Sequence, residues 1–373
     1  MENVLPWLEP RDVAALALTC RTMAAAARDL TSCRAADAAQ GLEGFAIPVV
    51  NCVDECRYPY FEYSPVSVLA RERRAFAFPR SISEKNAAGF DYGQFGGDGC
   101  RCIDCCRGEQ EDPGFPSQAP DDLTSAIELL DEDDDSDEAL PSKKKRRLSS
   151  SSCPCGRTIF GERAYDSNSP RLLSFQNQRE EEAPTPDDLP LIYECGPACS
   201  CTIQCCHRLS QRGASAELKV VRHPTKGWSL HAAQDIKPGA FICEYAGELL
   251  TTKEARKRHQ TYDQSPRATS LLVVREHLPK GDACLRFNID ATNVGNIARF
   301  INHSCDGGNL LSCLVRSAGC CVPRLAFFTR KEIQSGQELT FSYGVVEPGL
   351  ESSSRACFCG TSQCRGILPS EKT

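Results

Sequence analysis

The sequence predicts a mainly β protein that carries cysteine-rich zinc modules and a small N-terminal helical segment. Short apolar segments bounded by turn residues recur through its second half, where only one main helix is expected. The 24 cysteines occur in clusters. Because no secretory signal pattern opens the chain, we expect them to bind metal rather than form disulfides. No Gly-x-Gly-x-x-Gly follows a strand, which argues against a nucleotide-binding parallel sheet.

Length and charge narrow the possible functions. A chain of 373 residues provides material for two or three domains. Its apolar runs are short, so no membrane span is expected. The formal net charge of -7 argues against general coating of DNA. An acidic surface would favour a basic peptide as partner.

Residues 1–45 are expected to be helical. Pro10 can start a helix, and the apolar residues that follow have loosely helical spacing. Leu5–Val13, followed by Leu18-Thr19-Cys20-Arg21, resembles an F-box, which would dock a ubiquitin-ligase adaptor. A helical cap on the next domain is the interpretation that we favour.

Residues 46–212 contain a cysteine cluster split by an insert. Three tetrahedral zinc ions need twelve ligand positions, and nine thiolates fill them if three of the thiolates bridge two metals. Either Cys105 or Cys106 can be the third ligand. The predicted cluster ligands are Cys100, Cys102, Cys105, Cys106, Cys153, Cys155, Cys195, Cys199, Cys201 and Cys205.

The insert covers residues 107–152. Its acidic run, 131–138, and basic run, 143–147, cannot bury apolar surface, so we expect disorder. The basic run is either a nuclear-import signal or a solvated charge patch.

Residues 213–348 are predicted to form a compact β-rich domain. Thr251 and Glu254 form a capping box that starts its main helix. Strands are expected at 218–221, 228–230, 241–245, 271–274, 286–289, 325–328 and 338–342.

Four motifs occur in order along this segment. They are Lys226-Gly227-Trp228, Glu244-Tyr245-Ala246-Gly247-Glu248, Asn302-His303-Ser304-Cys305 and Leu339–Gly344. Alone, the Asn-His pair would be interpreted as a turn after a core strand. Together the motifs resemble the SET-domain lysine methyltransferases of the suppressor-of-variegation group, in its plant suppressor-of-variegation-related (SUVR-like) branch. The resemblance covers about residues 46–368 without the insert and implies a SET fold of short curved sheets with a pseudo-knot.

The resemblance implies an S-adenosylmethionine-dependent histone lysine methyltransferase of the nucleus and chromatin. Its substrate would be the histone H3 tail or the nucleosome, most often at the lysine in ninth position, a chromatin-silencing mark. We find no dedicated sequence-specific DNA-binding motif. The implied cofactor-binding residues are Lys226, Gly227, Trp228, Arg299, Asn302 and His303, and the implied catalytic residues are Tyr343, Tyr245 and Phe341.

The segments on either side of the domain resemble the zinc modules of the family. Residues 46–212 resemble the pre-SET module, with three zinc ions. Residues 349–373 resemble the post-SET module, in which Cys357, Cys359 and Cys364 are one ligand short of a zinc site and Cys305 would be the fourth. A three-cysteine loop completed by water is the alternative.

Several positions depart from the family pattern. Ser229 replaces a glycine and would be strained if its φ were positive. Leu271 lies in a strand where a tyrosine often contacts the cofactor, and Ser342 replaces an aspartate. Cys206-His207-Arg208 replaces the commoner Pro-Asn-Arg and leaves Cys206 as a spare thiol. Phe341 has no hydroxyl, which favours di- or trimethylation.

Two other functions stay open at this point. A non-catalytic zinc scaffold, or a ubiquitin-ligase adaptor with a degenerate SET domain, would explain the departures and the F-box-like start. A methyltransferase of non-histone proteins would differ only in peptide preference.

Overall fold

The computed structural model describes most of the expected catalytic domain and part of its surroundings. The insert, together with Cys100, Cys102, Cys105, Cys106 and Cys153, lies outside the described residues. These residues are 8, 10–56, 60–70, 155–158, 162–166, 169–173, 189–263, 270–277, 284–320, 322–344 and 355–369.

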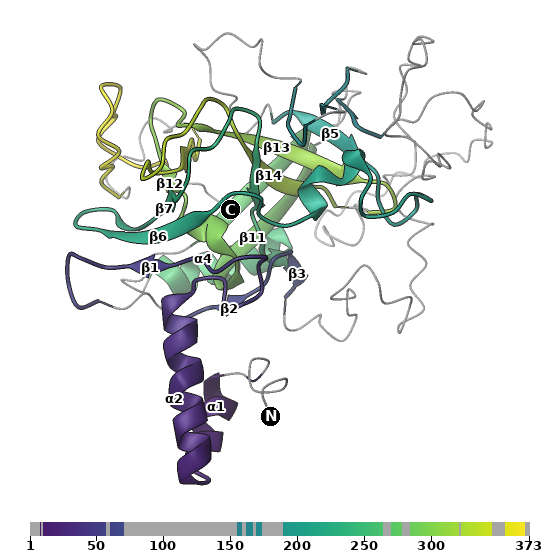
Figure 1. Ribbon diagram of the computed structural model, residues 1–373. Helices are drawn as coiled ribbons and strands as arrows, with labels where there is room; N and C mark the ends of the chain where they lie inside the picture. The colour runs from purple at the N-terminus through teal and green to yellow at the C-terminus, as the bar shows by residue number, and fades with distance from the viewer. Residues whose placement is uncertain are drawn as a thin grey trace.

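The N-terminal segment forms two helices, α1 (Pro10–Ala17) and α2 (Arg21–Ala36). The chain turns between them because Cys20 takes an extended conformation and caps α2, its Sγ accepting from Met23 N. In Figure 1, α1 lies against α2, and α2 extends away from the sheets. The helices are as expected, whereas the F-box-like docking stays a prediction. No described helix is long and apolar enough to cross a membrane.

The body of the protein consists of short sheets. A three-stranded sheet has the order β1 (Val49–Val50), β6 (Leu218–His223), β7 (Gly227–Ala232). A second has the order β10 (Leu271–His277), β11 (Cys284–Gly295), β9 (Gly247–Leu250), β3 (Val68–Leu69), and β2 (Glu62–Tyr63) also pairs with β11. The strands of residues 49–69 therefore join sheets built by residues 218–295.

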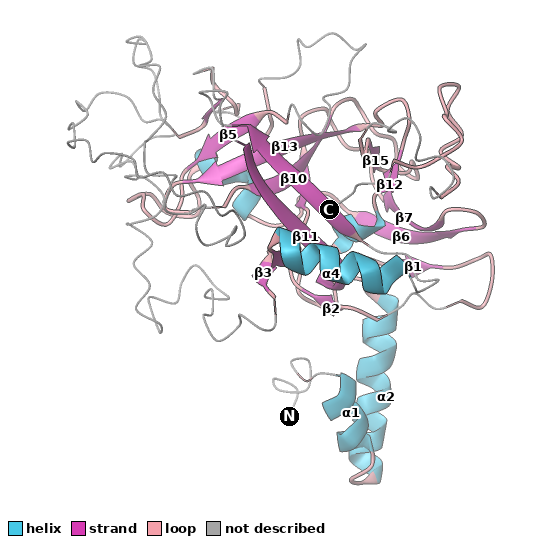
Figure 2. Ribbon diagram, turned by 180° about the vertical axis from the view of Figure 1, so that it is seen from behind, coloured by secondary structure: helices cyan, strands magenta, loops and turns pink. Residues whose placement is uncertain are grey.

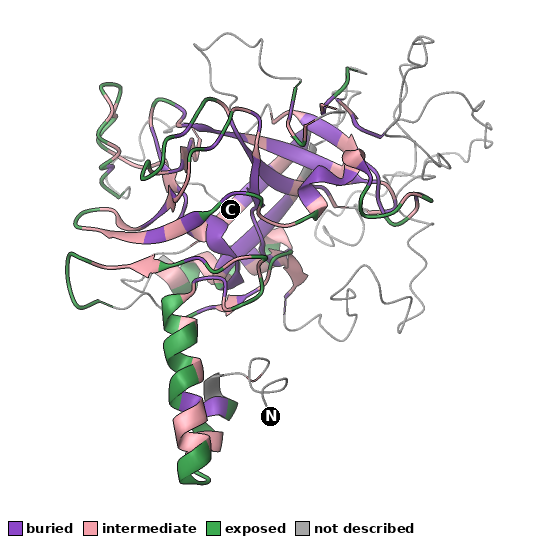
Figure 3. Cartoon of the chain, in the orientation of Figure 1, coloured by how far each residue is buried: buried purple, intermediate pink, exposed green. Residues whose placement is uncertain are grey.

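A third sheet forms the centre of the core. Its order is β4 (Arg157–Thr158), β5 (Leu191–Glu194), β13 (Leu310–Ser317), β14 (Arg324–Thr329), β8 (Phe241–Glu244). The central strands β13 and β14 are almost wholly buried, as Figure 3 shows by colour. A separate pair joins β12 (Asn302–His303) to β15 (Thr340–Phe341). The mainly β fold is confirmed.

The main helix, α4 (Thr252–Asp263), begins at the predicted capping box. Thr251 N donates to Glu254 Oε2 at 2.9 Å, and Glu254 N donates back to Thr251 Oγ1 at 3.3 Å. The helix lies across the sheet of β9 and β11 (Figure 2), where Ala255 is buried against Leu250. Two short 3-10 helices are η4 (Cys206–Gln211) and η5 (Ile297–Phe300).

A buried ionic network connects the cysteine-rich segment to the β-rich segment of residues 213–348. Glu194 is fully buried and accepts hydrogen bonds from Tyr165, Ser210 and Gln211. Arg324 donates to Glu194 at 3.0 Å and to the buried Glu244 at 3.4 Å. Burial raises the pKa of Glu244, and the charge of Arg324 opposes that rise. One guanidinium thus neutralises two buried carboxylates.

Replacing Arg324 with Met tests this network. Glu194 and Glu244 lose their shared cation while remaining buried, which costs about 3–5 kcal/mol. The apparent midpoint of thermal unfolding should fall by about 10 °C. Lys331→Met, at an exposed position just past β14, is the control and should unfold with the wild type. Equal unfolding temperatures for both variants would show that the network adds no stability.

Candidate active site and metal centres

The parallel pairing of β12 with β15 brings two of the predicted motifs together. Asn302 lies opposite Thr340, and His303 lies opposite Phe341. Tyr343 N, just beyond β15, donates to His303 Nδ1 at 3.1 Å, and the two rings are 5.3 Å apart. Predicted cofactor-binding and catalytic residues are therefore neighbours, although about forty positions separate them in the chain.

Glu338 connects the Lys226 motif to Asn302. Its Oε2 accepts from Lys226 Nζ at 2.7 Å, and its Oε1 accepts from Asn302 Nδ2 at 2.9 Å. Asn302 Nδ2 also donates to the carbonyl of Trp228 at 3.3 Å. Gly227 has φ +84°, a conformation that favours glycine at this hairpin turn. Glu338 is a site residue that the sequence analysis missed; its only signal was its place at the start of a predicted strand.

Ser229 is not strained. Its φ lies outside the left-handed region, because it continues β7 as an ordinary strand residue. Its hydroxyl is hydrogen-bonded to Val221 O at 3.0 Å and to His231 Nε2 at 2.9 Å. The condition under which a serine here would carry a cost is therefore not met. Leu271, another departure, packs against the small cluster around Leu250.

Arg299 is held by aromatic rings. Its guanidinium lies 4.3 Å from the centre of the Phe61 ring and 5.5 Å from that of Phe300. Phe61 directly precedes β2 and is buried. The N-terminal strands therefore help to place the segment that leads into Asn302.

An aromatic cluster lies beside the Asn-His segment and consists of Tyr245, Phe327, Phe341 and Tyr343. Phe341 is 4.7 Å from Phe327 and 4.9 Å from Tyr343, measured between ring centres. Tyr245 is 6.3 Å from Phe327. All three predicted catalytic residues are thus brought together. Phe327, fully buried on β14, is the member that the sequence analysis placed only within a strand.

The polar groups of this cluster are fixed by backbone carbonyls. Tyr245 donates to Ser270 O and Tyr343 donates to Ile301 O, each at 2.8 Å. Burial raises the pKa of Tyr343 above its usual range, so its hydroxyl keeps its proton at neutral pH. Tyr343 can therefore orient a reactant but is not a base.

His303 connects the aromatic cluster to a candidate metal centre. Burial, with a smaller effect of Arg365, lowers its pKa to about 4, so the ring is neutral at pH 7. Nδ1 accepts from a backbone N–H, which places the ring proton on Nε2. Cys305 Sγ lies 3.3 Å from that nitrogen and can accept from it.

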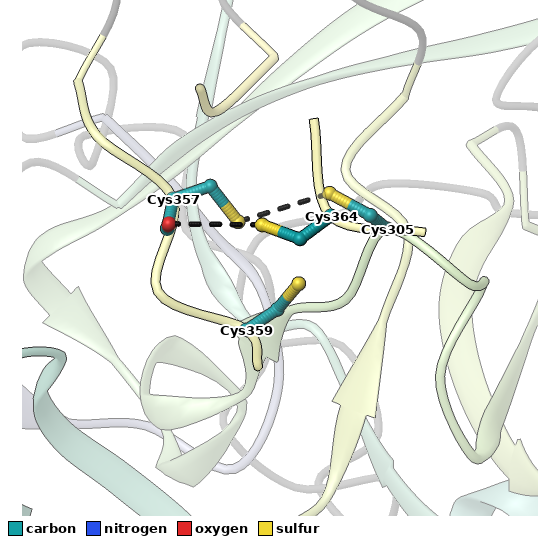
Figure 4. Close-up of side chains that lie close together, drawn as sticks. All are labelled: Cys305, Cys357, Cys359 and Cys364. Atoms are coloured by element: carbon teal, nitrogen blue, oxygen red, sulfur yellow. Dashed lines mark hydrogen bonds between the residues drawn. The ribbon is translucent and has the colours of Figure 1, made fainter. Parts of the chain in front are cut away.

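The C-terminal segment, called the tail below, places three thiols close to Cys305. Figure 4 shows the side chains of Cys305, Cys357, Cys359 and Cys364 converging from two separate segments. Their four sulfurs all lie within 4.8 Å of one another, and those of Cys305 and Cys357 are 3.8 Å apart. Sulfurs around a tetrahedral zinc are about 3.8 Å apart, given Zn–S bonds of about 2.3 Å. These four residues therefore fit a structural zinc site.

A second set of potential metal ligands lies at the end of β5. Cys155, Cys195 and Cys199 form one group of potential ligands, and Cys195, Cys205 and His207 form another. Cys195 belongs to both groups, as a bridging thiolate would. Cys201 instead accepts from Arg208 Nε at 3.3 Å. The five predicted cluster cysteines outside the described residues are not placed.

Comparison with known proteins agrees with this geometry. The SET domain family model matches residues 227–344. The histone-lysine N-methyltransferase SUVR3 of Arabidopsis thaliana is 41% identical over 99% of this chain and 90% of its own length.

Solved structures share the fold. The methyltransferase domain of human SETMAR has TM-score 0.56 and 25% identity, and the match covers 90% of this chain and 97% of that one. KRYPTONITE in complex with mCHH DNA, an H3(1–15) peptide and SAH has TM-score 0.53 and 24% identity, covering 89% of this chain and 53% of that one.

A substitution of Gly308 tests how tightly the chain is packed beside β15. Its φ is +74°, and an added Cβ would lie 2.3 Å from Thr340 O. Gly308→Ala should therefore destabilise the protein by about 2–4 kcal/mol, measured by thermal unfolding. Gly336→Ala is the matched control, because Gly336 has φ +89° but open space around it. Its cost should be about 1 kcal/mol, and equal losses would contradict tight packing at Gly308.

Proposed function

The chain belongs to the SET-domain histone-lysine N-methyltransferases, and we propose that it methylates the histone H3 tail at the lysine in its ninth position. The observation that supports this proposal is the convergence of Tyr245, Phe341 and Tyr343 on the Asn-His segment. S-adenosylmethionine, when bound, supplies an electrophilic methyl group. The residues of the chain must bind it and deliver a neutral lysine amine.

The amine must lose its proton before it can react. A lysine side chain has a reference pKa of about 10.4, so neutralising it at pH 7 costs roughly 4.6 kcal/mol. Buried aromatic surroundings reduce that cost, because they disfavour the ammonium form. The rings of Tyr245 and Phe341 are 6% and 4% exposed and provide such surroundings.

Tyr343 is proposed to hold the amine in line with the methyl group. Its hydroxyl stays protonated and is fixed by Ile301 O, so its oxygen lone pairs remain as acceptors for an amine N–H. Orientation of this kind can account for a large part of a rate enhancement. Phe341 offers no hydroxyl that would hold a water molecule against the amine, which favours di- or trimethylation as product.

The hydrogen bonds around Glu338 indicate how the cofactor would be held. Lys226 is paired with Glu338, and Asn302 uses its Nδ2 for Glu338 and Trp228. These contacts leave Asn302 Oδ1 as an acceptor suited to the ammonium group of S-adenosylmethionine. We assign Lys226, Gly227, Trp228, Arg299, Asn302 and His303 to this site, with Glu338 as a positioning residue.

Two observations support a histone tail as substrate. The net charge of -7 favours a basic peptide, and KRYPTONITE, which shares the fold, was solved with an H3(1–15) peptide. A histone substrate implies a nuclear, chromatin-bound enzyme. The basic run 143–147, our proposed import signal, lies outside the described residues.

A methylation assay tests the proposal. Wild-type protein should transfer radiolabel from S-adenosylmethionine to histone H3, and a peptide array with mass readout should show the target lysine and methyl count. Tyr343→Phe should lower the rate about 100-fold or more, because the amine loses its orienting oxygen.

Tyr262→Phe is the matched control, since the Tyr262 hydroxyl, near the end of α4, donates to the buried Asp290 and not to a group of the aromatic cluster. It should keep wild-type activity. Calorimetry should show that Tyr343→Phe still binds S-adenosylmethionine. A folded, zinc-loaded wild type that methylates no histone would refute the proposed function, and failure to bind the cofactor would favour a scaffold.

We also propose three zinc ions in the cluster at β5 and one in the tail site. Cys364→Ser should lower the zinc content by one ion per chain, measured by elemental analysis of purified protein. Activity should fall with it, because Cys305 lies two residues after His303 in the same motif. Cys33→Ser, at an exposed thiol on α2, is the control. An unchanged zinc content in Cys364→Ser would exclude the tail site.

A further inference from the structure

The loop that follows β1, residues 51–56, lies beside the β6–β7 hairpin that carries Trp228. Both project from the same side of the molecule (Figure 1). Arg222 on β6 lies directly opposite Trp228 on β7, and its guanidinium carbon is 5.6 Å from the centre of the Trp228 ring, a cation–π distance. The same guanidinium donates to Asp54 of the loop, from Nη2 at 2.8 Å and from Nε at 3.0 Å. We infer that Asp54 is a positioning residue of the cofactor site and orients the Trp228 ring through Arg222.

Asp54 is itself held in place by the loop. Asn51 Nδ2 donates to Asp54 Oδ1 at 2.9 Å and to the carbonyl of Cys56 at 2.8 Å. Cys56 N also donates to Asp54 Oδ1, at 3.0 Å. Asn51 directly follows the parallel pairing of β1 with β6, which ends one residue before Arg222. The register of that pairing therefore brings the loop next to Arg222.

Two different contacts restrain Trp228. Its carbonyl accepts from Asn302 Nδ2 at 3.3 Å, which restrains the backbone, whereas Arg222 contacts the ring. Trp228 is only half-buried, so packing alone restrains the ring less than it would in a core. The hydrogen bonds from Arg222 hold the pKa of Asp54 well below its usual range, so the pair stays ionic at neutral pH. A ring that is held before the cofactor arrives needs less ordering when the cofactor binds.

This role differs from a contribution to folding. Asp54 is exposed and Arg222 is half-buried, and ion pairs at such positions add little to stability. Asp54→Asn keeps the shape of the side chain and removes its charge, so it should unfold at the wild-type temperature. It should nevertheless weaken cofactor binding, because the guanidinium that contacts the ring loses its charged partner. The inference rests on the proposed function, since it takes Trp228 as part of the S-adenosylmethionine site.

Two measurements on the full-length protein test the inference. Trp7 and Trp228 are the two tryptophans of the chain, so the fluorescence of Trp7→Phe protein reports on Trp228 alone. In that background, Asp54→Asn should raise acrylamide quenching about twofold, and calorimetry should show that S-adenosylmethionine binds about tenfold more weakly. Arg222→Gln should give the same two changes, and adding Asp54→Asn to it should change neither further. Asp235→Asn, at an exposed carboxylate beyond the other end of β7, is the matched control and should leave both measurements unchanged.

The outcomes separate this inference from the proposed function. Unchanged quenching or unchanged cofactor affinity in Asp54→Asn would overturn the inference. Additive losses in the double variant would also overturn it, because Asp54 would then not act through Arg222. Neither measurement needs methyl transfer, so a wild type that binds S-adenosylmethionine but methylates no histone would refute the proposed function alone.

Discussion

The parallel contact between β12 and β15 is the constraint on which the site depends. Only two residues on each side form the pair, yet their register sets Asn302 against Thr340 and His303 against Phe341. A slip by one residue would turn each side chain to the opposite face. The aromatic cluster would then lose Phe341, and Asn302 would lose Glu338. Two neighbouring residues stabilise this register. Gly308 lies close to Thr340, and Asn309 is hydrogen-bonded to Thr340 and to Glu338.

Metal binding and the reactive residues share one short segment. His303 accepts from the backbone of Tyr343 through one nitrogen and faces Cys305 through the other. A zinc ion on Cys305 would therefore restrain the ring that positions Tyr343. The tail supplies the other three thiols at the same point. Metal binding by the C-terminal segment would for this reason be coupled to assembly of the site.

Local patterns predicted much of this structure. The capping box of α4, the strands at 218–221 and 271–274, and the three thiols of the tail follow from residue type and spacing, whereas Cys305 as their fourth partner was implied by the family resemblance. Glu338 and Phe327 did not, because their significance arises only when distant segments pair. β13 was missed as well. Its Ser312, Cys313 and Arg316 interrupt the alternation of apolar residues, and it is a strand because β5 and β14 hold it on both sides. The positive φ considered for Ser229 is not observed, because the strand continues through this residue.

The network of Glu194, Arg324 and Glu244 connects the cysteine cluster to the aromatic cluster. Glu194 directly precedes Cys195, and Glu244 directly precedes Tyr245. A single guanidinium therefore binds the carboxylates that stand beside both. Pulling the cysteine-rich segment away from the central sheet would leave a buried carboxylate without its counter-charge. The two segments are therefore expected to unfold as one cooperative unit.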